Sequence, residues 1–141
     1  MTSRKPRPRA VTIIALMLLS TAVFALVFWA SFFSGSGHIT EDKCYLTFEY
    51  AFPAADTWAA VTATIGAIGL LRRKSWGVLF TLLAASAGIF LGLMDLLFDI
   101  QYGIFWMPSP DVATEIGLVV WLLTLSPVAI WYVWTRREAL L

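Results

Sequence analysis

The chain is poor in the residues on which most soluble enzymes and metalloproteins depend. It contains one cysteine and one histidine, and only 13% of its 141 residues are charged. The single Cys44 excludes an intramolecular disulfide and a relay built on two thiols. The single His38 excludes bis-histidine haem ligation within one chain and disfavours a Cys/His zinc site. We therefore expect no cofactor and no metal centre.

Several common sequence motifs are absent as well. The chain has no GxGxxG or Walker sequence for nucleotide binding and no GxSxG elbow for a hydrolase. No lysine lies in an apolar run, which excludes a Schiff base of the retinal type. The net charge of +1 is not that of a nucleic-acid-binding protein, so no nucleic-acid partner is expected.

What the chain has in excess is hydrophobic residues. They make up 60% of the sequence, and the mean hydropathy is +0.79. These values are far from the balance of a soluble domain and are typical of an integral membrane protein. We therefore expect the lipid bilayer to be its principal partner and the fold to be a single all-α membrane domain over residues 11–141.

Long apolar runs predict a bundle of four transmembrane helices. The first run has 23 uncharged residues, enough to cross a hydrocarbon core of about 30 Å at about 1.5 Å per residue. Pro53 and Ser109-Pro110 favour helix starts, Gly103 favours a helix end, and Pro127 predicts a kink. The predicted helices are about 11–33, 54–71, 75–102 and 110–135.

The first apolar run has an alternative interpretation as a secretory signal peptide. Its basic start fits a signal, and Ser34-Gly35-Ser36 loosely imitates a cleavage site of small residues. The run is longer than the usual signal core of about 7–15 residues. We therefore expect a retained membrane helix.

The segment 38–52 is predicted to be a partly structured outer loop. Thr40, followed by two acids, is suited to capping a short helix. Alternation of apolar and polar residues over 44–50 is equally typical of a strand, so the pattern leaves both open. We expect His38 to be a surface residue and Cys44 to be inert.

The distribution of charge predicts the orientation. Nine of the ten Lys and Arg residues lie in the tail 1–10, the turn 72–74 or the C-terminal segment, and eight of the nine acids lie toward the other side. The positive-inside rule then places both termini in the cytoplasm, with residues 1–10 as a basic tail. We expect the location to be a plasma membrane of bacterial type.

Two of the predicted helices carry an acid beside a stripe of small residues. In the run 81–99, six positions fall within about 40° of one line on a helix: Thr81, Ala85, Gly88, Gly92, Asp95 and Asp99. In the run 54–71, Asp56 shares a face with Ala60, Ala63 and Ala67. Small residues let membrane helices approach closely, so the stripes predict helix contacts and an acid at the outer end of each.

These acids are the candidate functional residues. Carboxylates at membrane depth are costly, and so they mark candidate sites. Simpler explanations are that Asp99 and Glu115 lie at helix ends in the water interface, and that Asp56 interacts with the dipole of its helix. The predicted ligand-binding set, lining an outward-facing cavity between the last three helices, is Asp56, Asp95, Asp99, Glu115, Glu49 and Gln101.

Three functions follow from this set. The first is binding or transport of a cation or small amphiphile in the acidic intramembrane cavity. The second is an intramembrane enzyme that uses Asp95 or Asp56 as a general acid on a lipid or isoprenoid substrate. The third is a structural or accessory subunit whose acids fix helix pairing, with a membrane partner subunit. The size of the bundle and the single Cys44 would also permit a homodimer.

Overall fold

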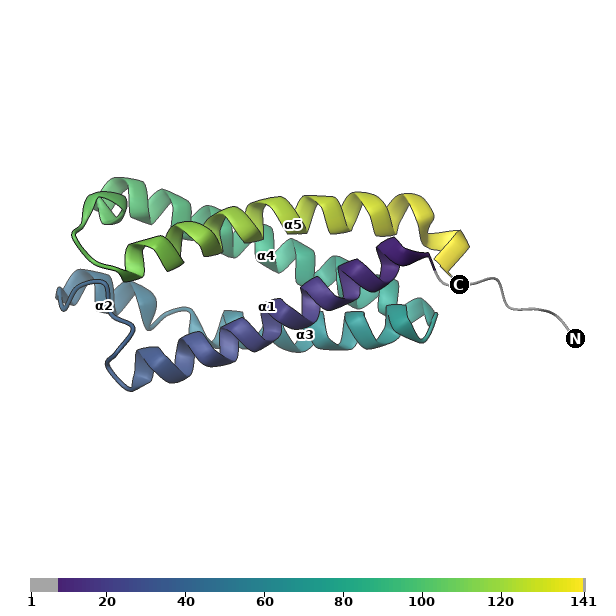
Figure 1. Ribbon diagram of the computed structural model, residues 1–141, viewed down its shortest axis with the longest axis horizontal. Helices are drawn as coiled ribbons and strands as arrows, with labels where there is room; N and C mark the ends of the chain where they lie inside the picture. Colours follow the sequence, from purple (N-terminus) through teal and green to yellow (C-terminus); the bar gives the residue numbers. More distant parts are fainter. Residues whose placement is uncertain (1–7, 141) are drawn as a thin grey trace, which may run out of the picture.

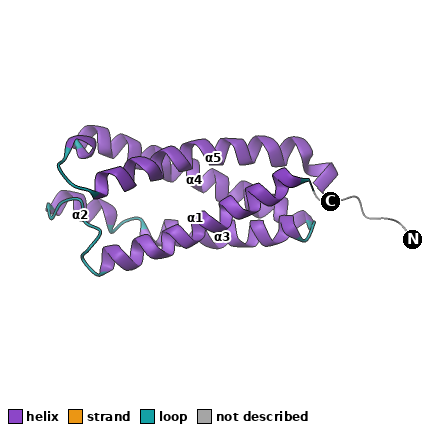
Figure 2. Ribbon diagram, viewed as in Figure 1, coloured by secondary structure: helices purple, strands orange, loops and turns teal. Residues whose placement is uncertain are grey.

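The computed structural model describes residues 8–140, which contain helices and short connections but no strand (Figure 1). Figure 2 shows how little of this range is loop. The predicted basic tail includes basic residues at positions 4, 5 and 7, which lie outside the described range. The elements are α1 (Arg9–Phe33), α2 (Lys43–Glu49), α3 (Pro53–Leu71), α4 (Ser75–Tyr102), the 3-10 helix η1 (Ile104–Trp106) and α5 (Asp111–Leu140).

Within residues 8–140, four segments are long and apolar enough to cross a membrane, which confirms the predicted number of such helices. These segments are Arg9–Phe33, Lys43–Leu71, Ser75–Tyr102 and Asp111–Leu140, the second of which combines α2 with α3. The predicted boundaries agree closely with α1, α3 and α4. The last helix is longer than predicted, because it continues past the basic residues near position 136 to Leu140.

The helices pack in the order in which they occur in the chain. α1 packs on α3, α3 on α4 and α4 on α5, whereas α1 and α5 make few backbone approaches. α1 begins and α5 ends at the same end of the bundle, together with the α3–α4 turn (Figure 1). We call this end, with Arg72, Lys74, Arg136 and Arg137, the basic end. The opposite end, with α2 and η1, we call the acidic end.

Glycines permit the closest helix contact, between α3 and α4. Gly69 and Gly77 oppose each other, and a Cβ built on Gly69 would lie 2.6 Å from the backbone nitrogen of Gly77. One turn further, a Cβ on Gly66 would lie 2.8 Å from the backbone nitrogen of Thr81. The prediction that the basic turn makes these helices antiparallel neighbours is confirmed.

The stripe of small residues on α4 faces inward, as predicted. Thr81, Ala85, Gly88 and Gly92 are buried, while Phe90, on another face of α4, is exposed. The stripe contacts two partners in succession. Its first part packs on α3, and the two later glycines pack against α5, where Cβ atoms would meet a serine hydroxyl and leucine side chains.

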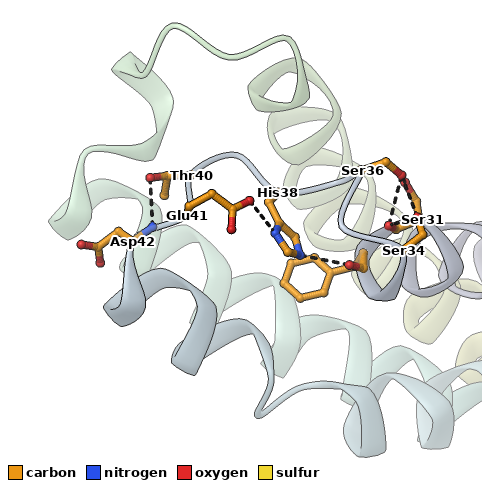
Figure 3. Close-up of polar contacts among 8 residues, drawn as sticks. Ser31, Ser34, Ser36, His38, Thr40, Glu41 and Asp42 are labelled. Carbon is orange, nitrogen blue, oxygen red and sulfur yellow. Dashed lines mark hydrogen bonds and ion pairs between the residues drawn. The ribbon is translucent and has the colours of Figure 1, made fainter.

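The open choice for the outer loop is resolved as a helix. α2 begins after Asp42, whose carboxylate accepts hydrogen bonds from the backbone N–H groups of Cys44 (2.8 Å) and Tyr45 (3.4 Å). Thr40 is not the N-cap as predicted. Its hydroxyl instead accepts a hydrogen bond from the backbone N–H of Asp42, the N-cap residue itself (3.3 Å; Figure 3).

The prediction that His38 lies on the surface is wrong. Its side chain is only 10% exposed and packs against the ring of Phe32, with 4.4 Å between centroids. Nδ1 lies 2.8 Å from the carboxylate of Glu41, and Nε2 lies 3.0 Å from the carbonyl oxygen of Phe32 (Figure 3). These contacts fold the connection back onto the end of α1, where serine hydroxyls 31, 34 and 36 also bond one another.

α2 folds over the acidic end of the bundle. Its Tyr45 is 1% exposed, and Phe48 stacks on Phe98 of α4 with 3.7 Å between ring centroids. The buried face repeats every three to four residues, as expected for a short amphipathic helix. α2 therefore shields the ends of α4 and α5 that the sequence pattern leaves open to water.

The N-cap of α2 predicts a pH-dependent contribution to stability. The Tyr102 hydroxyl and the backbone N–H of Cys44 bond the charged Asp42 carboxylate and hold its pKa below the usual 3.8. The stabilisation is therefore present at neutral pH and is lost as the pH falls below about 4. Asp42→Asn keeps an acceptor at the cap but cannot titrate.

Thermal unfolding of wild type and Asp42→Asn from about pH 6 to about pH 3 measures this contribution. The difference in stability is expected to be constant above about pH 5 and to shrink below about pH 4. Other titrating groups cancel in the difference. A difference that does not change with pH would show that the carboxylate at position 42 plays no such part.

Candidate functional site

Five of the six predicted ligand-binding residues converge at the acidic end. They come from four helices, and we call them the acidic cluster: Glu49 of α2, Asp56 of α3, Asp95 and Asp99 of α4, and Glu115 of α5. Glu115 is close enough to the other four to interact electrostatically with each. Asp95 likewise interacts with Glu49, Asp56 and Asp99. Residues 66 positions apart in the sequence thus meet in one site, which no local pattern could specify.

Much of the acidic cluster is shielded from water. Asp99 is 3% exposed, Glu115 5% and Glu49 7%, while Asp56 and Asp95 are half-buried. The expectation that Asp99 and Glu115 lie at a water interface is therefore wrong. Both are at helix ends, as predicted, but α2 covers them.

The acids have few partners of their own. The indole N–H of Trp29 donates a hydrogen bond to Oδ2 of Asp56 at 2.8 Å. Oδ2 of Asp99 is buried with no hydrogen-bond partner. Within residues 8–140, no ion pair joins a lysine or arginine to any member of the cluster. Buried carboxyl groups without a cationic partner are costly in their charged form.

Asp56 lies against α1, because its Oδ2 accepts the hydrogen bond from Trp29. It also borders a cavity of about 370 Å³ between α1 and α3, where Trp29, Thr57 and Thr64 are further lining residues. The first helix, which has no acid, therefore supplies a wall of the site that the prediction assigned to the last three helices.

A second cavity borders Glu115. It has a volume of about 170 Å³ and lies between α1 and α5, beneath Ile39 and Tyr45. Asp111 also lines it. The described cavities thus reach the acidic cluster from two sides, through Asp56 and through Glu115, instead of forming the single cavity that was predicted.

Gln101 differs from the other predicted residues because its side chain is exposed. Among the described residues, no three His, Cys, Asp or Glu side chains are placed so that they could hold a metal ion. In the part of the chain that the structure describes, the cluster therefore lacks the arrangement of a coordination cage. Cys44 is exposed and has no disulfide partner in the described range.

Three aromatic residues that line the described cavities were not predicted as site residues. Trp29 bonds Asp56, and Tyr45 covers the side of Glu115. Trp121, the only tryptophan that lies deep in a predicted span, donates its indole N–H to the hydroxyl of Thr21 at 2.8 Å. Its depth was a usable signal, because a buried indole N–H needs an acceptor.

Comparisons with protein-family models, with curated proteins and with solved structures find no match for this chain.

Proposed function

We propose that this is a small membrane protein that binds or transports a cation or a small amphiphile with a cationic group at the acidic cluster. The observation that carries the proposal is a set of five carboxyl groups from four helices, three buried and two half-buried, with no lysine or arginine partner within residues 8–140. A bound cation would offset the electrostatic cost of bringing these groups together.

The orientation proposed from the charges places this site on the outer side of the membrane. The basic end carries Arg72, Lys74, Arg136 and Arg137, and basic residues favour the cytoplasmic side. Both termini would then be cytoplasmic, in a plasma membrane of bacterial type. The acidic cluster would face the exterior beneath α2, from which cations could reach it.

The buried, unpartnered oxygen of Asp99 favours a ligand site over a purely structural one. A structural acid is expected to be satisfied within the fold, as Asp56 is by Trp29. An unsatisfied carboxylate oxygen costs stability in the free protein and becomes useful when a ligand supplies the missing donor. An ammonium group provides both a positive charge and such donors.

The test is ligand-dependent melting with butylammonium chloride, with sodium chloride at equal ionic strength as the control. We expect butylammonium to raise the melting temperature of the wild type, because a ligand that binds only the folded state stabilises it. Asp95→Asn is expected to fold and to lose most of this response. Glu138→Gln, at an exposed position of α5 at the basic end, is the matched control and should keep it.

Two results would contradict the proposal. No stabilisation of the wild type by butylammonium beyond that of sodium would exclude an ammonium site. If Asp95→Asn fails to fold and the wild type shows no response to butylammonium, the structural or accessory function is favoured instead.

A further inference from the structure

Among the described residues, three cavities lie in a row along the seam between α1 and α5. Their volumes are about 460, 370 and 170 Å³. The first two share Gly117 and Trp121 as lining residues, and the second and third share Phe24 and Thr114. We call this row of cavities the α1–α5 groove.

The α1–α5 groove is apolar over most of its length and acidic at one terminus. Near the basic end its lining includes Ile13, Met17 and Val128. At the acidic end it reaches Glu115, which is 5% exposed. From Val128 to Glu115 the groove extends about 20 Å along α5, given a rise of about 1.5 Å per residue.

The width of the groove limits what can occupy it. Midway along, the indole N–H of Trp121 on α5 bonds the hydroxyl of Thr21 on α1 at 2.8 Å. A transmembrane helix, about 10 Å or more in diameter, would have to break this hydrogen bond and separate the two helices. A single alkyl chain needs no such separation. Gly117 lines the groove and leaves space for such an alkyl chain, because a Cβ added at Gly117 would meet no atom within 4 Å.

We infer that the ligand is a long-chain ammonium amphiphile, whose alkyl chain lies in the α1–α5 groove and whose ammonium group lies at Glu115. The carboxyl groups identify the head group, because the groove ends at Glu115 and Asp111, whose oxygens can accept hydrogen bonds from an ammonium group and form an ion pair with it. The apolar walls identify the tail. This inference rests on the proposed function and deepens it, since the ligand would enter sideways from the bilayer.

The experiment compares butylammonium with dodecylammonium on protein in phosphatidylcholine nanodiscs, with dodecanol and empty nanodiscs as controls. The wild type is expected to bind dodecylammonium at least tenfold more tightly than butylammonium and not to respond to dodecanol. Gly117→Leu fills the groove and should abolish this preference while leaving butylammonium binding unchanged. Ala30→Leu adds the same side chain at an exposed position of α1 outside the groove and should behave as the wild type.

A second measurement does not depend on any variant. A photoreactive dodecylammonium probe should label residues of the α1–α5 groove, such as Met17 and Trp121, in the wild type. Equal binding of both amines, or labelling confined to other faces, would overturn the inference and leave the proposed function intact. Labelling that is displaced only by a membrane helix would identify a protein partner instead. Absence of any ammonium binding would reject the proposed function and this inference together.

Discussion

Gly69→Ala is expected to lower the free energy of unfolding by about 1–3 kcal/mol, although alanine favours a helix over glycine by about 1 kcal/mol. The added methyl group would lie 2.6 Å from the backbone nitrogen of Gly77 and equally close to the ring of Trp76. Backbone cannot rotate away as a side chain can, so α3 and α4 must separate. Reversible unfolding in mixed micelles, followed by circular dichroism, measures the change.

Gly117→Ala is the matched control for this prediction. The substitution is the same and Gly117 also lies within a helix, but an added Cβ would meet no atom within 4 Å. The control is therefore expected to be neutral or to stabilise by up to about 1 kcal/mol. Equal effects of the two substitutions would show that the α3–α4 contact is not limited by the size of these residues.

The contrast between these glycines shows how far the sequence could predict packing. The spacing of small residues correctly predicted the buried face of α4, because a periodicity of 3.6 residues is a local property of the chain. It could not predict that the stripe contacts α3 at Thr81 and α5 at Gly88, since small residues occupy the whole stripe and do not specify the partner helix. Nor could it distinguish Gly117, which opens on a groove.

The acidic residues also show what the sequence could predict and what it could not. Their sequence context identified the five residues that converge, because carboxylates are rare in apolar runs. Their burial was not predictable from that context, because it depends on α2, whose seven residues fit a helix and a strand equally well. The pairing of Trp29 with Asp56 joins positions 27 residues apart, beyond any local pattern. His38 was misjudged for a similar reason, since its partner Phe32 lies in another element.

Asp99→Leu is expected to stabilise the ligand-free protein by about 1–3 kcal/mol and to abolish its stabilisation by butylammonium. The substitution removes a buried carboxylate whose Oδ2 has no partner and which lies among other acids. Replacing an unsatisfied buried polar group by an apolar one of similar size removes its desolvation cost. Unfolding in micelles, with and without butylammonium, measures both effects on one sample.

The opposite signs of these two effects separate a ligand site from a structural one. If the acidic cluster fixes helix pairing, removing Asp99 should destabilise the fold, and no ligand response should be present to lose. Glu138→Leu serves as the control, because Glu138 is exposed near the other end of α5, away from the acidic cluster and from the α1–α5 groove. It should change stability little and keep the ligand response. If the empty site is strained and ligand binding relieves the strain, Asp99→Leu should raise stability and abolish ligand binding, whereas the control substitution should do neither.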